Sequence, residues 1–428
     1  MKKVVFWHRR DLRIDDNHGL SKATNENEKV FPVFIFDENI LQELPSNDKR
    51  VSIIQQSINL LNEAYLKHGS QLHILYGDPK KVLIDFIDEY NIDTVYTNED
   101  YEPYALKRDK SIYDYLKVKG KEMKFFKDQV IFAKNEILNK TEPYKVYTHY
   151  SKLWLKELSE DSLKPFSINF NTLSSIVTHK NISVFNKGFV FVDEVKFKPQ
   201  ITSELLLNYK DTRDLPYLDN GTSKLSVYLR FGLVSVRSIV KQLKNSKTLL
   251  GELIWREFFQ MLIWHHPYSA NLELKAKYRG LPYQNNNIFF EAWKKGETGY
   301  PIVDAGMREL KATGLMHNRV RMITASFLIK HLCIDWRWGE AYFAEKLLDY
   351  ELASNVGNWQ WVAGCGSDSA PYFRVFNPTL QQEKFDPDFI YIKKWVPEFG
   401  TEKYSKPIVN HKQAREKILQ LYKNHLQS

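Results

Sequence analysis

Short runs of β-branched and aromatic residues alternate with amphipathic stretches of helical length through the first 130 residues. These apolar runs occupy positions 4–7, 30–36, 72–76, 94–97 and 123–126. Apolar strands separated by amphipathic helices are typical of a parallel sheet that helices cover on both faces. The pattern therefore predicts an α/β domain over residues 1–130, with a Rossmann-like parallel sheet.

The pattern changes twice after residue 130. Residues 131–205 carry scattered Ser, Asn, Thr and Pro without a sustained period, which indicates a long connection between domains. From residue 206 to residue 428 the pattern is helical, and we expect an all-α domain there. Gly and Pro predict the breaks between its helices, at Gly221, Gly251, Pro267, 280–282, 299–301 and Gly314.

Charge and aromatic residues are concentrated in the C-terminal half of the chain. The 428 residues carry a formal net charge of +9, from 61 basic and 52 acidic side chains. The net charge is −2 over 1–130, +3 over 131–200 and +8 over 201–428. Eight of the ten tryptophans also lie in the last stretch: Trp255, Trp264, Trp293, Trp336, Trp338, Trp359, Trp361 and Trp395. A basic surface with flat rings suits a polyanion with exposed bases, although composition alone favours tryptophans in a helical core.

The composition also narrows the compartment and the chemistry. Cys333 and Cys365 are too few for a disulfide framework or a four-ligand zinc site, and they point to a reducing compartment. No apolar run is long enough for a signal peptide or a membrane span, so we expect a soluble, cytoplasmic protein. No hydrolase triad, P-loop or metal-ligand spacing is present, and no GxGxxG turn follows the first predicted strand.

Two segments early in the helical half carry candidate binding residues. Segment 212–235 places three hydroxyl residues at an expected helix start, where free backbone amides suit a phosphate: Thr222, Ser223 and Ser226. An ordinary helix cap is the alternative there. Segment 251–267 places four side chains on one helix face, which could hold a stacked base and its phosphate or could simply be solvated: Glu252, Trp255, Arg256 and Phe259.

Two later segments combine polar side chains with buried-looking surroundings. In 299–330, Asn318, Arg321 and Met322 fall within one helical turn beside an apolar run, so the polar groups need a ligand or a carboxylate. His317 is expected to be structural. In 349–387, two acids precede an amide and two tryptophans, and the acids could pair with Arg321 or could cap a helix: Asp349, Glu351, Asn355, Trp359 and Trp361.

Taken in this order, the four segments resemble the photolyase/cryptochrome family, and within it the class I cyclobutane pyrimidine dimer photolyases. The opening string VVFWHRRDLRIDDNHGL is similar to that family's first strand and loop. The resemblance covers nearly the whole chain. It implies an N-terminal α/β antenna domain, a long linker, and a C-terminal all-helical domain that binds FAD in a folded conformation.

The resemblance also implies roles for individual residues. The side chains expected at the flavin's phosphates and nearby parts are Tyr209, Thr222, Ser223, Lys224, Leu225 and Ser226. Asp349, Tyr350 and Glu351 are expected on the adenine and ribitol side, with Arg321 paired to Asp349 near the isoalloxazine and Asn355 facing flavin N5. At the DNA, Glu252 would hydrogen-bond the dimer, and the further contacts expected are Trp255, Arg256, Asn318, Arg319, Met322, Trp361 and Gln381.

The reaction implied by the resemblance is light-driven repair of pyrimidine dimers in DNA by an electron from excited, reduced FAD, in a monomeric enzyme. The string LMHNRVRM lacks the histidine pair of (6-4) photolyases, and NWQW keeps Trp361 where DASH cryptochromes have tyrosine. Trp359 and Trp336 match the family's electron-transfer chain, whose outermost tryptophan is replaced here by Tyr283. A blue-light photoreceptor with the same flavin is the alternative function, and a light-independent single-strand-binding protein is a third.

The antenna region departs from the folate-binding relatives. In NEDYEPYALKRD, Ala105 stands where those relatives have a glutamate. Asp100, Glu102 and Tyr104 resemble the deazaflavin or flavin type instead. A second chromophore would therefore be of deazaflavin or flavin type rather than methenyltetrahydrofolate.

Overall fold

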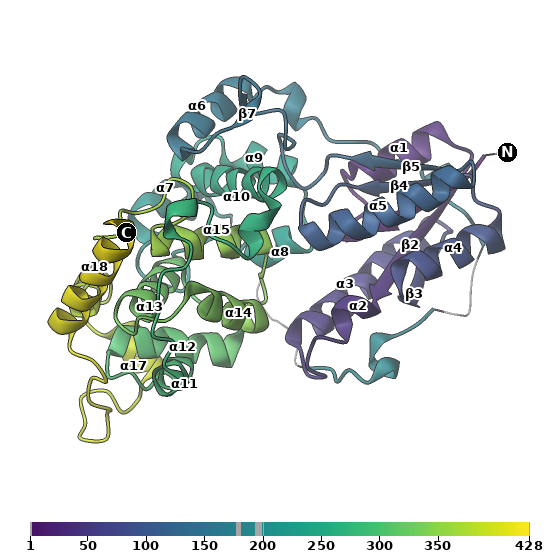
Figure 1. Ribbon diagram of the computed structural model, residues 1–428. Helices are drawn as coiled ribbons and strands as arrows, with labels where there is room; N and C mark the ends of the chain where they lie inside the picture. The colour runs from purple at the N-terminus through teal and green to yellow at the C-terminus, as the bar shows by residue number, and fades with distance from the viewer. Residues whose placement is uncertain (1, 177–180, 193–198, 200, 428) are drawn as a thin grey trace. The chain divides into compact units, whose positions relative to one another are not determined.

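A computed structural model of the chain describes residues 2–176, 181–192, 199 and 201–427 (Figure 1). The chain forms two compact units, and each is built from stretches that are separated in the sequence. The first comprises Met1–Ile137, Lys152–Pro199 and Lys224–Asn245, and the second Leu138–Ser151, Gln200–Ser223 and Ser246–Ser428. Residues from the expected linker 131–205 thus belong to both units, and the three-part division of the chain remains a prediction.

The first unit contains a five-stranded parallel sheet in the order β3-β2-β1-β4-β5. Its strands are β1 (Lys3–His8), β2 (Lys29–Asp37), β3 (His73–Gly77), β4 (Thr94–Asn98) and β5 (Glu122–Phe126). All five predicted strands are present, and the predicted parallel α/β fold is confirmed. The order reverses at β1, so β1 and β4 form the switch point at whose carboxyl end such sheets bind ligands.

Helices cover both faces of this sheet. Successive strand residues point to opposite sides, and apolar side chains on both sides are buried. Val5 and Trp7 belong to a buried cluster with Phe86 and Ile112, which lie on α4 (Pro79–Tyr90) and α5 (Pro103–Val118). On the other face, α1 (His18–Glu26) brings Gly19 so close to the Phe6 ring that a Cβ there would lie 2.8 Å from it. The remaining helices of the N-terminal stretch are α2 (Glu38–Leu41) and α3 (Lys49–Leu66).

Local capping fixes where these helices begin. The side chains of Asn17, Asp48 and Asp78 accept backbone N–H bonds at the starts of α1, α3 and α4. Pro79 follows Asp78 in the first turn of α4, where its missing N–H costs nothing. At the other end of α4, Asn91 adopts the left-handed conformation that stops the helix.

A stretch from the C-terminal half completes the first unit. It holds α8 (Ser226–Arg230) and α9 (Val236–Leu243). Arg237 in α9 is only 4% exposed, and its guanidinium donates to Asp16 at 2.9 Å and to Asp128 at 2.9 Å. Asp128 also accepts from Arg13 at 2.8 Å. Short 3-10 turns η1 (Asp161–Leu163), η2 (Phe170–Thr172) and η3 (Val184–Lys187) run through the middle stretch.

Among its described residues, the second unit is helical apart from one short hairpin, β6 (Leu138–Asn139) with β7 (Glu142–Pro143). Helix α6 (Tyr147–Glu157) begins in this unit and ends in the first. The other helices of the second unit are α7 (Ser203–Thr212), α10 (Lys247–His265), α11 (Asn287–Lys295), α12 (Pro301–Thr313), α13 (Asn318–Lys330), α14 (Trp336–Lys346), α15 (Leu352–Ala363), α16 (Pro378–Phe385), α17 (Ile390–Trp395) and α18 (His411–Gln427), with 3-10 turns η4 (Pro267–Ala270) and η5 (Ala276–Tyr278). The predicted helical C-terminal region is confirmed. Among the described residues, no helix has the length and apolar character needed to cross a membrane.

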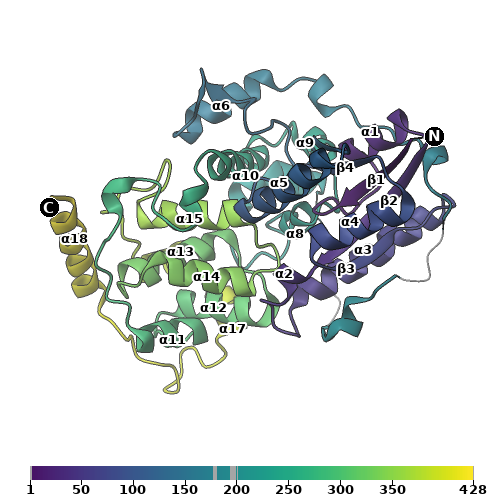
Figure 2. The ribbon, with the colours of Figure 1, turned by 45° about the vertical axis from the view of Figure 1, so that its right-hand side comes forward.

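Helix α15 is central to this unit and lies between α10 and α13 in both views (Figures 1 and 2). It approaches α14 closely at Gly339, where a Cβ would lie 2.1 Å from the Trp359 ring. The tryptophans Trp293, Trp336 and Trp359 are all at most 2% exposed and help to form the core. The prediction from composition, that tryptophans lie in a helical core, is therefore correct for these three residues.

One predicted helix break is wrong. Gly251 lies inside α10 rather than at an end of it. A single glycine costs a helix about 1 kcal/mol relative to alanine, which the buried apolar residues of α10 outweigh. By contrast, Gly314 does end α12, in the left-handed conformation with φ +74°.

Candidate functional site

The second unit contains a cavity of about 600 Å³ beside α13 and α15. Nine residues singled out from the sequence line it together: Asn318, Arg321, Met322, Asp349, Tyr350, Glu351, Asn355, Trp359 and Trp361. Residues predicted from two separate segments are therefore brought to one cavity by the packing of α13 against α15.

Arg321 and Asp349 form the ion pair that the sequence suggested. The Arg321 guanidinium lies 2.9 Å from Oδ2 of Asp349, and its Nε donates to the carbonyl of Met316 at 2.7 Å. The second carboxylate oxygen, Oδ1 of Asp349, is buried without a hydrogen-bond partner in the described chain. Buried polar atoms are nearly always paired, so this oxygen is suited to accept a hydrogen bond from a ligand.

Asn355 presents its side-chain oxygen as the acceptor. Its amide nitrogen donates to Oε1 of Glu340 at 2.9 Å and to the Glu340 carbonyl at 3.2 Å. Burial raises the pKa of Glu340, and the hydrogen bond from Asn355 acts in the opposite direction. Because the amide nitrogen already has partners, Oδ1 is the atom of Asn355 that can accept a hydrogen bond from a ligand.

Glu351 is buried and accepts hydrogen bonds from three side chains. It accepts from Arg256 at 3.0 Å, from Gln260 at 2.9 Å and from Ser354 at 2.8 Å. Arg256, expected at the DNA, therefore has a 12% exposed side chain and an acidic partner. Gln260 was not singled out from the sequence, although it lies one helical turn after Arg256 on the same face of α10. Its Oε1 is a second buried acceptor without a partner in the described chain.

Glu252 is paired with a basic residue that the sequence reading missed. The guanidinium of Arg213, just after α7, donates to Oε1 of Glu252 and lies 5.7 Å from the centre of the Tyr209 ring. Burial raises the pKa of Glu252, and the charge of Arg213 opposes that rise. Nothing in the local sequence indicated this pair, because Arg213 follows α7, Glu252 lies on α10, and the two are 39 positions apart.

Arg319 is also held by an acid. It donates to Oδ2 of Asp214 at 2.8 Å, and its guanidinium lies 4.5 Å from the centre of the Phe385 ring. Gln381 lies on α16, four residues before Phe385, with a half-buried side chain. These two residues and Glu252 do not line the cavity, whereas Asn318, Met322 and Trp361 do, so only part of the expected DNA-contact set lines it.

The two tryptophans expected to clamp a base differ in their surroundings. Trp361 lines the cavity from α15. Trp255 on α10 does not line it, and one of its faces is stacked by Tyr147, with ring centres 3.7 Å apart and planes within 4°. Both indoles are half-buried. Tyr147 lies in the segment that the sequence predicted to be a linker.

The expected phosphate-binding string is divided between the units. Tyr209, Thr222 and Ser223 belong to the second unit, whereas Lys224, Leu225 and Ser226 belong to the first. Helix α8 does begin at Ser226, as expected, and the residue before it, Leu225, makes no side-chain cap. The backbone at Lys224 is left-handed with φ 52°. The ordinary serine or threonine cap, which was the alternative for this segment, is therefore absent at the start of α8.

The residues expected in electron transfer are buried or half-buried in the second unit. The indole of Trp336 donates to Oε1 of Glu273 at 3.2 Å, and the Arg337 guanidinium lies 4.8 Å from its ring centre. The hydroxyl of Tyr283 lies 3.3 Å from that of Tyr422. Burial raises the pKa of Tyr283 well above its ordinary value.

A smaller cavity, of about 240 Å³, lies at the carboxyl end of β1 and β4 in the first unit. Arg10 reaches both Asp100, at 3.4 Å, and Glu102, at 3.0 Å. Burial acts to raise the pKa of Asp100, but nearby arginines, Arg10 first among them, lower it to about 2. Tyr104 donates to Asp37 at 2.7 Å, and Ala105 is buried. The residues expected at an antenna chromophore thus lie near this switch point.

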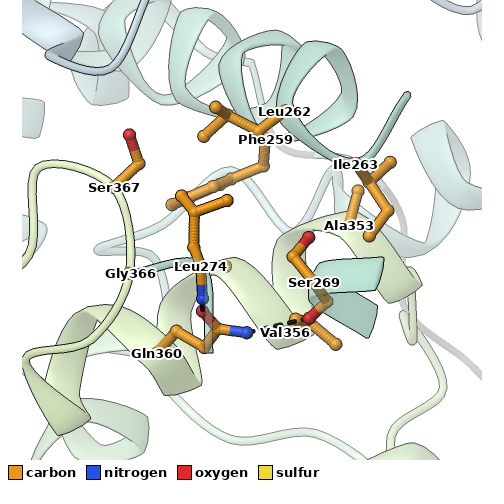
Figure 3. A pocket seen from close by; sticks show the side chains of 11 residues that line it. Phe259, Leu262, Ile263, Ser269, Leu274, Ala353, Val356, Gln360, Gly366 and Ser367 are labelled. Carbon is orange, nitrogen blue, oxygen red and sulfur yellow. Dashed lines mark hydrogen bonds between the residues drawn. The ribbon is translucent and has the colours of Figure 1, made fainter. Parts of the chain in front are cut away.

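A third cavity, of about 300 Å³, is lined mainly by apolar side chains of α10 and α15 (Figure 3). Its polar residue Gln360 donates to the carbonyl of Ser269 at 2.8 Å and accepts from the backbone N–H of Leu274 at 2.9 Å. Both ends of this amide therefore already have partners within the chain.

Comparison with known proteins gives consistent matches in both halves of the chain. Residues 4–167 match the family model described as DNA photolyase, and residues 249–424 match the model described as the FAD binding domain of DNA photolyase. A deoxyribodipyrimidine photo-lyase from Synechococcus sp. is 34% identical over 473 residues, covering 98% of this chain and 96% of that protein.

Solved structures are similar over the full length. A bacterial class III photolyase from Agrobacterium tumefaciens has a TM-score of 0.89 at 32% identity, covering 100% of this chain and 98% of that one. An archaeal photolyase from Sulfolobus tokodaii, whose structure holds two FAD molecules, has a TM-score of 0.88 at 36% identity, covering 99% and 100%.

Proposed function

The chain belongs to the DNA photolyase family, and we propose that it repairs cyclobutane pyrimidine dimers in DNA, driven by light and with FAD as its cofactor. The observation that carries this proposal is the cavity beside α15, where the Arg321–Asp349 pair, the acceptor of Asn355 and two tryptophans converge. Relatives named deoxyribodipyrimidine photo-lyase support the same substrate.

The residues of the cavity fit a flavin. Oδ1 of Asp349 is a buried acceptor without a partner in the described chain, and a flavin dinucleotide carries both amino and hydroxyl donors. Arg321 would supply positive charge near a reduced, anionic ring, and Oδ1 of Asn355 would accept from its N5–H. Bound in its reduced form, FAD would supply an electron donor that light excites and that regains its electron after the ring opens.

The chain's own residues would recognise and hold the dimer. A damaged pair is already poorly stacked, so extruding it from the duplex costs less than extruding normal bases. Glu252, oriented by Arg213, would hydrogen-bond the polar edge of the dimer. Trp255 and Trp361 would pack against its apolar ring, and Asn318 and Met322 would complete the pocket.

Basic residues around the cavity would bind the DNA strand. Residues 201–428 carry a net charge of +8, and Arg319 and Gln381 lie on α13 and α16. Arg256, which the sequence placed at the DNA, would act through Glu351 as well, because it is already paired with that carboxylate. Neutralising phosphates releases counterions, so binding should weaken as salt rises. We further propose that the protein is a cytoplasmic monomer. Gel filtration would test the monomeric state.

A second chromophore of deazaflavin or flavin type is proposed for the small cavity at β1 and β4. The arginines around Asp100 and Glu102 provide donors for a polar ring edge, and the archaeal relative holds two FAD molecules. The cavity is smaller than most ligand sites, so Arg10 would turn outward to admit a flat ring. Chromatography of the pigments released by denaturation tests this, and recovery of a folate would contradict it.

The central experiment mixes the protein, with its flavin fully reduced, with a duplex oligonucleotide that contains one thymine dimer. Blue light should restore thymine absorbance, and the dark sample should not change. Glu252→Ala should retain flavin yet repair poorly, whereas Glu291→Ala, at an exposed position on α11, should match the parent. Absence of recovery in the parent would overturn the repair proposal and favour the blue-light photoreceptor.

A further inference from the structure

We propose that Tyr147 is a positioning residue for damage recognition: its ring supports one face of Trp255, so that the opposite face is held ready for a flipped pyrimidine dimer. The inference rests on the proposed function and deepens it. It gives a role to the stretch 138–151, which the sequence assigned to a linker and which belongs to the second unit.

The stack between the two rings is close and nearly parallel. The ring centres of Tyr147 and Trp255 are 3.7 Å apart with planes within 4°, so the tyrosine ring stacks on one face of the indole. Phe258 contacts the same indole edge-on at 5.6 Å, and Phe259 contacts it at 5.4 Å with a 30° tilt. Three aromatic rings therefore restrict the rotamers of Trp255.

Tyr147 is itself fixed to the helix that carries Trp255. Its hydroxyl donates to the carbonyl of Gly251 at 2.9 Å, one helical turn before Trp255 on α10. Burial raises the pKa of Tyr147, so the hydroxyl keeps its proton for this bond. The tyrosine thus contacts α10 at two points, through its ring and through its hydroxyl.

The backbone of the same segment is tied to the loop after α15. The N–H of Tyr147 donates to Oδ2 of Asp368 at 3.2 Å, and the hydroxyl of Ser367 donates to the carbonyl of Lys145 at 2.6 Å. Helix α15 carries Trp361, the second tryptophan expected at the dimer. One short segment therefore joins α10 to the loop that follows the other clamp-bearing helix.

Such a support matters because ordering a side chain on binding costs affinity. An indole on a half-exposed helix face would otherwise sample several rotamers, and each dimer would have to fix it again. A ring that is already stacked avoids that cost, and aromatic pairs are favourable beyond their buried area. The benefit should appear in dimer binding and not in binding of undamaged duplex, which relies on phosphates.

The test measures Kd in the dark by fluorescence anisotropy, with the flavin-loaded protein and two duplexes that differ by one thymine dimer. Tyr147→Leu should raise Kd for the dimer duplex about 3- to 10-fold, which corresponds to the free energy of one aromatic pair. Kd for the undamaged duplex should stay unchanged. Tyr147→Phe, which keeps the ring, should bind within about twofold of the parent. Tyr144→Leu is the matched control, because Tyr144 lies in the same segment but packs on Tyr150.

Four results would overturn the inference. Unchanged dimer binding by Tyr147→Leu would show that the stack does not position Trp255. Tighter dimer binding would mean that Tyr147 is a lid over the face the dimer needs. Equal losses for both duplexes, or loss of flavin absorbance, would indicate a purely structural role. A parent protein that does not prefer the dimer duplex would instead overturn the proposed function.

Discussion

The guanidinium of Arg213 donates to the carboxylate of Glu252, a group whose pKa burial raises. The arginine therefore favours the ionised form of a half-buried acid beside the cavity. An ionised carboxylate can only accept hydrogen bonds, so the pair decides which edge of a base Glu252 can recognise.

Replacing Arg213 should make repair depend on pH. In Arg213→Leu the pKa of Glu252 would rise further, because burial is no longer opposed by the nearby charge. The ionised form would then persist only at higher pH than in the parent. We expect the repair yield of the variant to fall as pH is lowered and to recover as pH rises, with its midpoint at higher pH than the parent's, by thymine absorbance under blue light. Arg415→Leu, at an exposed position on α18, should show the parent's profile; a flat profile in both variants would contradict the role of the pair.

Replacing Asp349 should weaken flavin binding. Asp349→Asn removes the charge that pairs with Arg321 and leaves that half-buried guanidinium without its acid. Loss of a charged hydrogen bond costs about 1.5–3 kcal/mol, so Kd for FAD should rise about tenfold or more. The absorbance ratio of flavin to protein after dialysis measures this. Asp388→Asn, an exposed carboxylate, should retain flavin like the parent, and equal retention by both variants would exclude Asp349 from the site.

Tyr283 should be a slow terminal electron donor. Tyr422 gives its hydroxyl proton to the carbonyl of Ala363 at 2.8 Å, so at the contact with Tyr283 it is the acceptor. Oxidation of Tyr283 releases a proton, and a phenol oxygen is a poor base to receive it. Tyr283→Trp should therefore speed flavin photoreduction under steady light with external reductant.

Tyr283→Phe provides the complementary measurement. It should photoreduce more slowly than the parent, because phenylalanine is not oxidised under these conditions. If this variant photoreduces as fast as the parent, Tyr283 is not part of the chain through Trp359 and Trp336.

Acid should destabilise the second unit through a histidine pair. Nε2 of His331 lies 2.8 Å from Nδ1 of His411, and burial lowers the pKa of His331 to about 3. Below pH 6.5 the unfolded chain binds a proton that folded His331 does not, so stability falls as pH drops from 6.5 towards 3. This site alone should remove about 2 kcal/mol between pH 7 and pH 5. Urea unfolding at the two pH values tests this, and His331→Phe should show a smaller difference; an equal difference would contradict the assignment.

Patterns close in sequence allowed the fold and much of the cavity to be predicted. The strands follow from runs of β-branched residues, and Arg321 and Asp349 each stood out within a short segment. Arg213 and Tyr147 were missed because their partners, Glu252 and Trp255, lie 39 and 108 positions away. Such pairs depend on how helices pack, which local periodicity does not encode.

The linker prediction failed to identify Tyr147 for a related reason. Irregular composition between 131 and 205 indicates the absence of long helices, but not whether a segment is anchored. Hydrogen bonds to Gly251 and Asp368 hold Tyr147 in place, and neither partner is near it in the sequence.

The discontinuous first unit has a consequence for synthesis on the ribosome. The five strands are complete once residue 126 has emerged, but Arg237, which neutralises Asp16 and Asp128, lies more than a hundred residues later. Until Arg237 emerges, Asp16 and Asp128 both lack the positive charge that it supplies to them in the folded unit. The N-terminal unit therefore reaches its final state only after part of the other unit has been translated, which makes residues 224–245 a late step in its folding.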